Sequence, residues 1–250
     1  LQDVGVRCFT YLSTAKLVLE AAAKAQIPVI ILDHPNPLQM WHKAGPICAP
    51  KFQSFLGALP IPFLYGSTMG TVLEHANATI GTNLTVIPSD QPIDPWQMAF
   101  IPPSPNLMSI DHIYAYPLTV FFEGTEYSEG RGTAYPFLQC GAPWVNAQQL
   151  ASTLNAQKTP GVFFEPISFT PHSCHGIADS PKFKGQQCHG VFIHLFDHKI
   201  VQPLTVAHTL ISTLFKLYPE HHKLITSKDR YTLDLLLGSD EWRKELLSLI

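Results

Sequence analysis

The 250-residue sequence has few charged side chains and no excess of positive charge that would favour binding to a polyanion. Charged residues make up 14% of the chain, and the net charge is −3. Nucleic-acid-binding proteins usually carry a basic patch, so we expect no nucleic-acid partner. No apolar run approaches the ~20 residues that a bilayer-spanning helix needs, so no membrane span is expected. The 46% of hydrophobic residues indicates a globular protein with a real core.

Cysteine is scarce and irregularly placed. The five cysteines are an odd number without regular spacing, which argues against a disulfide framework. Structural zinc is an alternative, because several possible ligands gather late in the chain: His172, Cys174, His175, Cys188 and His189. Zinc sites usually use tight pairs such as Cys-x2-Cys, which this group lacks, so we expect neither a metal nor another cofactor. A dinucleotide-dependent dehydrogenase is disfavoured because no Gly-x-Gly-x-x-Gly follows an expected strand.

The chain begins at Leu1 and passes at once into a motif-like segment, QDVGVR, at residues 2–7. It has neither an initiating methionine nor a targeting region. We therefore expect it to be a fragment of a longer protein, in which a signal peptide would lie outside this sequence.

The first part of the chain has the pattern of an α/β domain. An amphipathic helix is expected at residues 13–26, followed by the unbroken apolar run IPVIIL at 27–32. Such a run is typical of a central strand buried on both faces of a parallel sheet, and it ends in a polar loop at 33–37. A second helix is expected at 68–79. The proline-rich stretch 81–105 reads as irregular, and we place a domain boundary within it, between residues 98 and 99.

The second part reads as a mixture of helices and strands, which indicates an α+β unit. Its expected elements are a strand at 116–123, a helix at 146–157, strands at 161–169 and 190–196, a helix at 203–218, and a last helix that begins near Ser239.

Charge is concentrated in one glycine-rich block, FFEGTEYSEGRGTAYPFLQCGAPW, at residues 121–144. It places Glu123, Glu126, Glu129 and Arg131 among small residues. Paired carboxylates can perform acid/base chemistry on a polar substrate, and arginine offers a planar fork for a carboxylate or phosphate. The alternative is a solvated loop that joins two elements, but the length of the block favours a site.

Four segments together carry a resemblance to a known family: QDVGVRCFTY at 2–11, LDHPNP at 32–37, PPSPN at 102–106, and the block that ends in SEGRGTAYPFLQCGAPW. They resemble the peptidoglycan exo-β-N-acetylmuramidases of the NamZ type, formerly a domain of unknown function, DUF1343. The SEGRGT run followed by GAPW is long enough to be highly specific, unlike a lone glycine motif.

The resemblance implies a two-part protein with an active cleft between its parts. Residues 1–98 would be the C-terminal part of a Rossmann-like parallel-sheet subdomain, incomplete here, and 99–250 an α+β C-terminal subdomain. The implied activity is that of a glycosidase that releases N-acetylmuramic acid from the non-reducing end of peptidoglycan fragments. A peptidoglycan-derived saccharide is thus the expected partner, and the cell envelope, the periplasm or the exterior the expected location.

The resemblance and the chemistry assign roles to individual residues. Glu123 and Glu129 are the expected catalytic acid and base or nucleophile. Arg131 is expected to recognise the lactyl carboxylate that distinguishes N-acetylmuramic acid. The expected substrate-binding set is Arg131, Arg7, Asp3, Tyr11, Asp33, Asn36, Asn106 and Thr133. As alternatives, Asp3 and Asp33 would only cap helices or brace loops, and Arg131 would form a structural ion pair with Glu123 or Glu129.

Two departures from the family pattern bear on activity. His34 stands where the family has an arginine in its LDRPNP motif. The family also carries a Pro-Glu-His-Gly motif upstream of the segments matched here, and this sequence does not contain it. The glutamate of that motif is a strong candidate for the catalytic carboxylate. A catalytically inactive muropeptide-binding module is therefore the alternative to a glycosidase.

Overall fold

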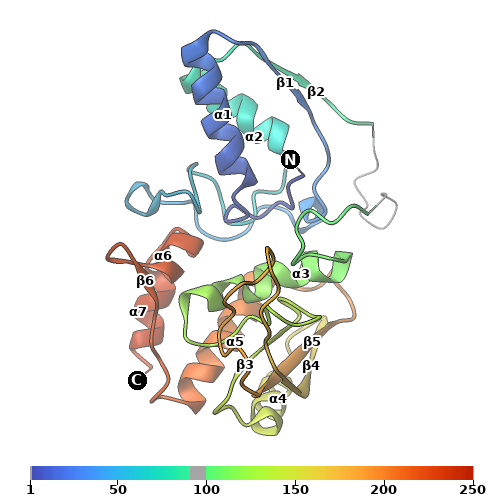
Figure 1. The fold of residues 1–250 in the computed structure, drawn as a ribbon, viewed down its shortest axis with the longest axis vertical. Helices are drawn as coiled ribbons and strands as arrows, with labels where there is room; N and C mark the ends of the chain where they lie inside the picture. Colours follow the sequence, from blue (N-terminus) through green and yellow to red (C-terminus); the bar gives the residue numbers. More distant parts are fainter. Residues whose placement is uncertain (1, 91–99, 250) are drawn as a thin grey trace. The chain divides into compact units, whose positions relative to one another are not determined.

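The computed structural model describes residues 2–90 and 100–249, and it contains two compact units (Figure 1). Unit 1 consists of Leu1–Pro103 together with Leu235–Ser239, and unit 2 consists of Ser104–Asp234 and Asp240–Ile250. The expected boundary between residues 98 and 99 lies outside the described residues. Nothing in the sequence pattern indicated the return of a late segment to unit 1. No described helix has the length and apolarity to cross a membrane.

Unit 1 is a small α/β layer. Its elements are α1 (Tyr11–Ala25), β1 (Val29–Leu32), α2 (Met69–Ile80) and β2 (Leu84–Ile87), with short 3-10 turns at Gln39–Trp41 and Pro50–Phe52. The two strands pair in parallel, with Val29 opposite Leu84. The two helices lie side by side on one face of the strands (Figure 1), and the core between them includes Leu12, Leu19, Leu73, Val29 and Ile31.

The expectation that residues 27–32 form a central strand buried on both faces is wrong. Among the described residues β1 pairs only with β2, and its side chains alternate between the helices and solvent. Ile30 and Leu32 are 64% and 77% exposed. The unbroken apolar run could not reveal this, because periodicity alone does not tell which faces of a strand are covered. The strand β2 was also missed, in a segment expected to be irregular.

Unit 2 is built on a three-stranded antiparallel sheet with the order β3-β5-β4. Its elements are α3 (Ile110–Thr119), the 3-10 turn η4 (Val120–Gly124), β3 (Gln139–Ala142), α4 (Ala147–Ala156), β4 (Val162–Phe169), β5 (Cys188–Leu195), α5 (Pro203–Leu217), β6 (Thr226–Ser227), β7 (Arg230–Tyr231), α6 (Thr232–Leu237) and α7 (Glu241–Leu247). The helices α3 and α4 contact the sheet, and α5 packs against both of them. The expected fold class, a parallel α/β part followed by an α+β part, is confirmed.

The prediction of a strand at residues 116–123 is wrong, because α3 and η4 occupy this stretch. All residues from His112 to Thr119 are buried. A helix that is covered on every side has no polar stripe, so its sequence resembles that of a buried strand. Pro117 lies inside α3, although proline disfavours the interior of a helix. The consequence for the site is that Glu123 lies on a tight turn and not at the end of a strand.

Candidate active site

The glycine-rich block of unit 2 holds Arg131 between two glycines in left-handed conformation. Gly130 and Gly132 both have φ of +80°. A Cβ atom on Gly132 would lie 2.5 Å from the His172 carbonyl oxygen, and one on Gly130 would lie 2.9 Å from the Tyr135 carbonyl oxygen. Other residues would meet both strain and collision there. The Gly-Arg-Gly sequence therefore folds into a tight turn from which only the arginine projects a side chain.

Arg131 joins the two expected catalytic carboxylates. Its Nη2 lies 2.7 Å from Oε1 of Glu123, and its Nε lies 3.6 Å from Oε1 of Glu129. The guanidinium also lies over the ring of Phe137, 4.8 Å from the centroid. Phe137 has φ of +67°, an uncommon value for an aromatic residue, and its amide donates to the Glu129 carbonyl at 2.7 Å. The surrounding chain thus fixes the position of the arginine.

Lys182 is a second cation that contacts Glu129, and the sequence did not reveal it. Its Nζ donates to the carbonyl oxygens of Phe122 and Tyr127 at 2.6 and 2.9 Å and to Oε2 of Glu129 at 3.2 Å. Glu129 is buried, and its two oxygens face one cation each. No local pattern around residue 182 marks the lysine as special, because its contacts lie more than 50 residues away in the chain.

These groups line a cavity of about 330 Å³, together with a stretch from the 178–182 loop. Burial raises the pKa of the Glu123 carboxyl, nearby Glu129 raises it further, and the Arg131 charge opposes both. Burial alone lowers the pKa of Arg131, but the two carboxylates outweigh this effect and raise it. The arrangement therefore combines a glutamate whose pKa is raised by burial, a glutamate that contacts two cations, and a permanently charged arginine.

Thr133 and Asn106 support this site from behind. The Thr133 hydroxyl donates to the Gly130 carbonyl at 2.7 Å and accepts from Nε2 of Gln139 at 2.7 Å, so it closes the turn. Asn106 is buried and its Nδ2 donates to the Ile177 carbonyl at 3.2 Å, which anchors the loop that leads into the cavity. These bonds give both residues a positioning role at the cavity of Arg131, and their expected contact with substrate stays a prediction.

Glu126, the remaining glutamate of the block, lies outside this cavity. Its Oε1 accepts from the Lys223 amide at 3.0 Å, and its Oε2 lies 3.8 Å from Nδ1 of His221. It therefore provides a matched control for the two cavity glutamates.

In unit 1, the structure brings Asp3 and Asn36 together around Gly5. Oδ2 of Asp3 accepts from the Gly5 amide at 2.8 Å, and a Cβ on Gly5 would lie 2.2 Å from Oδ1 of Asn36. The Asn36 side chain also accepts from the Leu38 amide at 3.0 Å. Burial raises the pKa of Asp3 to about 7, and its Oδ1 has no partner among the described residues. Asn36 thus shapes the loop after β1, and Asp3 keeps one free oxygen.

The other expected substrate residues of unit 1 have structural partners. Arg7 is 1% exposed, and its guanidinium donates to four carbonyl oxygens, those of Pro46, Ile61, Leu236 and Leu237. This environment speaks against contact of Arg7 with a substrate. Asp33 accepts from the Thr68 hydroxyl and the Gly70 amide, so it braces the start of α2, the alternative considered from the sequence.

Tyr11 is also held by a hydrogen bond within unit 1. Its hydroxyl donates to the Pro103 carbonyl at 3.0 Å, and its ring lies edge-on to Phe9 at a centroid distance of 4.8 Å. The expectation that these residues of unit 1 share one cleft with Arg131 stays a prediction.

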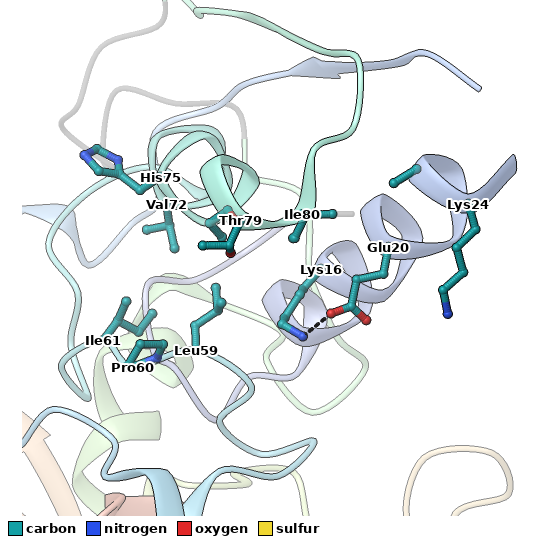
Figure 2. Close-up of a pocket in the computed structure, with 12 residues that line it drawn as sticks. Lys16, Glu20, Lys24, Leu59, Pro60, Ile61, Val72, His75, Thr79 and Ile80 are labelled. Atoms are coloured by element: carbon teal, nitrogen blue, oxygen red, sulfur yellow. Dashed lines mark hydrogen bonds and ion pairs between the residues drawn. The ribbon is translucent and has the colours of Figure 1, made fainter. Parts of the chain in front are cut away.

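A larger cavity of about 810 Å³ lies in unit 1 between α1, α2 and the 59–61 loop (Figure 2). Its walls are mostly aliphatic, and the ion pair of Lys16 with Glu20, at 2.5 Å, spans two positions on its rim. None of the expected site residues lines it. Size alone does not make it the better candidate, because acid/base chemistry needs carboxylates that converge on a substrate.

The zinc alternative finds no support in the described part of the chain. No three residues of the types His, Cys, Asp and Glu lie together there in a way that could hold a metal ion. Of the late cysteine and histidine group, Cys188 is buried at the start of β5, and Nδ1 of His189 is hydrogen-bonded to the Ser168 hydroxyl at 2.8 Å.

Comparison with known proteins gives a consistent result along the chain. Residues 1–111 match the family model of the N-terminal domain of exo-beta-N-acetylmuramidase NamZ, and residues 114–248 match that of its C-terminal domain. The chain is 36% identical over 234 residues to peptidoglycan beta-N-acetylmuramidase NamZ of Bacillus subtilis (strain 168), covering 91% of this chain. It spans 55% of the length of that relative.

Two solved structures of DUF1343 family proteins from Bacteroides fragilis NCTC 9343 are also similar. One matches with a TM-score of 0.85 at 29% identity over 98% of this chain, and the other with 0.73 at 31% identity over 99%. This chain covers 65% of each of those chains. The resemblance expected from the SEGRGT and GAPW motifs is therefore confirmed, and the chain belongs to the NamZ exo-β-N-acetylmuramidase family.

Proposed function

We propose that the protein containing this chain is a glycosidase that releases N-acetylmuramic acid from the non-reducing end of peptidoglycan fragments. The observation that carries the proposal is the cavity in which Arg131 lies between Glu123 and Glu129, in a chain of the NamZ family. The Bacillus subtilis relative is named a peptidoglycan beta-N-acetylmuramidase. Because this chain spans 55% of that relative, the activity belongs to the protein as a whole.

The two glutamates suit different steps of glycoside cleavage. The leaving oxygen must be protonated by a carboxylic acid, and a second carboxylate must act as base or nucleophile. Glu123 suits the acid, because burial raises the pKa of its carboxyl, which is the direction of shift that a general acid needs. Glu129 suits the second role, because each of its two carboxylate oxygens faces a cation, Arg131 on one side and Lys182 on the other.

Arg131 suits the recognition of the lactyl carboxylate. A guanidinium has five N–H donors, and the two ion pairs engage those on Nη2 and Nε. The side chain is 31% exposed, so the remaining donors can meet an incoming carboxylate from the cavity. N-Acetylglucosamine has no such carboxylate, and the site would therefore distinguish the two sugars by charge.

The test compares chromogenic β-glycosides of N-acetylmuramic acid and N-acetylglucosamine, with protein made from the full reading frame that encodes this chain. We expect cleavage of the muramic glycoside alone. Glu123→Gln and Glu129→Gln should each lower kcat/KM by about two to four decades, whereas Glu126→Gln should leave it nearly unchanged. Equal cleavage of both glycosides, or equal effects of all three substitutions, would contradict the assignment.

Arg131 gives a separate test of recognition. Arg131→Ala should lower kcat/KM for the muramic glycoside by about one to two decades, from the loss of a charge-assisted bond worth roughly 1.5–3 kcal/mol. Arg131→Lys should recover only part of this loss, because lysine lacks the planar fork. Full recovery by lysine would show that a point charge suffices.

A muropeptide-binding module without catalysis is the second candidate. It is favoured by the ion pairs that already engage both cavity glutamates. In that case the protein from the full reading frame would bind N-acetylmuramic acid in calorimetry, lose this binding in Arg131→Ala, and cleave neither glycoside.

A further inference from the structure

A second cavity of unit 2, of about 500 Å³, borders the same Gly-Arg-Gly turn. Gly132 and Thr133, the two residues that follow Arg131, form part of its wall. We call this cavity the Tyr135 groove, and the residues that line it are Gly132, Thr133, Ala134, Tyr135, Gln139, Ile167, Ser168, Phe169, Thr170, His172 and Phe192. One turn of chain therefore contributes to two cavities, one through the side chain of Arg131 and the other through the residues after it.

The floor of the Tyr135 groove is the solvent-facing side of the three-stranded sheet. Gln139 on β3 lies opposite Phe192 on β5, and Ile167 comes from β4. The other side of the sheet carries buried residues such as Phe164 and Ile193, against which the helices pack. The groove is thus built on a rigid sheet, with a loop wall on each side.

The lining of the groove is aromatic and uncharged. Tyr135 is 51% exposed, and its ring lies edge-on to that of Phe192 at a centroid distance of 5.4 Å and an angle of 85°. No Asp, Glu, Lys or Arg is among the lining residues. The Tyr135 hydroxyl and the His172 ring form no hydrogen bond to another described residue, so both are open to a ligand.

This chemistry differs from that of the neighbouring charged cavity and fits a neutral sugar. A pyranose offers an apolar face of C–H groups, which suits an aromatic ring, and hydroxyl or amide groups, which suit uncharged donors and acceptors. A charged stem peptide would find no partner of opposite charge in the groove. The cavity beside Arg131 is lined by five charged residues: Glu123, Glu129, Arg131, Asp179 and Lys182. The two cavities therefore suit ligands of different charge.

We propose that the Tyr135 groove is the binding site for the neutral sugar that follows N-acetylmuramic acid in the substrate, with Tyr135 as its stacking platform. This proposal rests on the proposed function for the identity of the neighbouring sugar. In a peptidoglycan strand that sugar is N-acetylglucosamine, which becomes the leaving group of the cleavage. The groove would therefore set the preference for a saccharide leaving group and leave the bond-breaking groups untouched.

The first test measures binding without any cleavage. Saturation-transfer NMR with methyl β-N-acetylglucosaminide should show contact with the protein made from the full reading frame. Tyr135→Ala should weaken binding about tenfold, which corresponds to about 1.4 kcal/mol, whereas Tyr135→Phe should retain it. Phe163→Ala is the matched control, because Phe163 is an aromatic residue of β4 with 50% exposure that does not line the groove. Absence of binding, equal loss in the control, or stronger binding of a stem peptide would overturn the proposal.

The second test separates the groove from the chemistry. With protein from the full reading frame, Tyr135→Ala should lower kcat/KM about tenfold for the muramic acid–glucosamine disaccharide. It should leave unchanged the hydrolysis of N-acetylmuramic acid β-fluoride, whose leaving group is too small to occupy the groove. An equal loss on both substrates would refute the assignment. If the wild type cleaves neither substrate, the proposed glycosidase fails, while the NMR result still decides whether the groove binds the neutral sugar.

Discussion

Replacing Lys182 with methionine should destabilise unit 2, because the ammonium group joins three acceptors that lie far from it in the chain. It donates to the carbonyls of Phe122 and Tyr127 and to the Glu129 carboxylate. Methionine keeps the length and the apolar stem of the side chain. Of the two cations beside the buried Glu129 carboxylate, the substitution would leave only Arg131, whose Nε lies 3.6 Å from Oε1.

The magnitude follows from these contacts. A hydrogen bond to a charged group contributes about 1.5–3 kcal/mol, and the loss of one partner from a buried ion pair costs about 3–5 kcal/mol. The Lys182 side chain is 24% exposed, so water replaces part of the interaction. We therefore expect a loss of about 2–4 kcal/mol, or a fall in the unfolding temperature of roughly 5–15 °C for a chain of this size.

Calorimetry of the wild type and two lysine variants measures the effect. Lys184 is an exposed lysine two residues further along the same loop, so Lys184→Met should change the stability by less than about 0.5 kcal/mol. If Lys182→Met unfolds at the same temperature as Lys184→Met, the three contacts do not stabilise the fold and the reasoning is refuted. A double-mutant cycle with Glu129→Gln should show a coupling of about 1 kcal/mol or more, and a coupling of zero would assign the effect to the carbonyl contacts alone.

Two further substitutions test local features. Gly132→Ala should lower the free energy of unfolding more than Gly176→Ala, by about 1–3 kcal/mol. Both glycines have positive φ, but a Cβ would meet a carbonyl oxygen, at 2.5 Å, only at Gly132; equal losses would contradict the predicted clash. Burial raises the pKa of Asp3 from 3.8 to about 7, so its contribution is most favourable below pH 4 and is lost as the pH rises toward 7. Asp3→Asn should therefore match the wild type in denaturant unfolding near pH 4 and exceed its stability near pH 8, by up to about 4 kcal/mol; a variant that is no more stable at pH 8 would show that Asp3 is not the cause.

The amphipathic elements were predictable from the sequence, because one covered face leaves a readable pattern. The helices expected at residues 13–26 and 203–218 are α1 and α5 with ends shifted by one or two residues. Elements covered on every side were not predictable in this way. The segment 116–123 carries no polar stripe, and its helical form depends on partners such as α5 that lie distant in the chain.

The site was partly predictable for a similar reason. The density of charge around Arg131 pointed to the cavity before its geometry was known, and the glycines beside it indicated a tight turn. Lys182 could not be recognised, because its neighbour Lys184 has the same local setting and only the fold distinguishes them. The motif that contains Arg7 was expected to belong to the substrate site, and only the fold shows that this arginine is buried inside unit 1.

The four carbonyl bonds of Arg7 have a consequence for the order in which the protein can be assembled during translation. Two of the four acceptors are the carbonyls of Leu236 and Leu237, which lie 229 and 230 positions after Arg7 in the chain. Gly238, with φ of +76°, lies directly against the guanidinium. While the ribosome is still adding residues 104–234, the guanidinium can reach only Pro46 and Ile61. Unit 1, although it begins the chain, can complete its interior only after almost the entire chain has been synthesised.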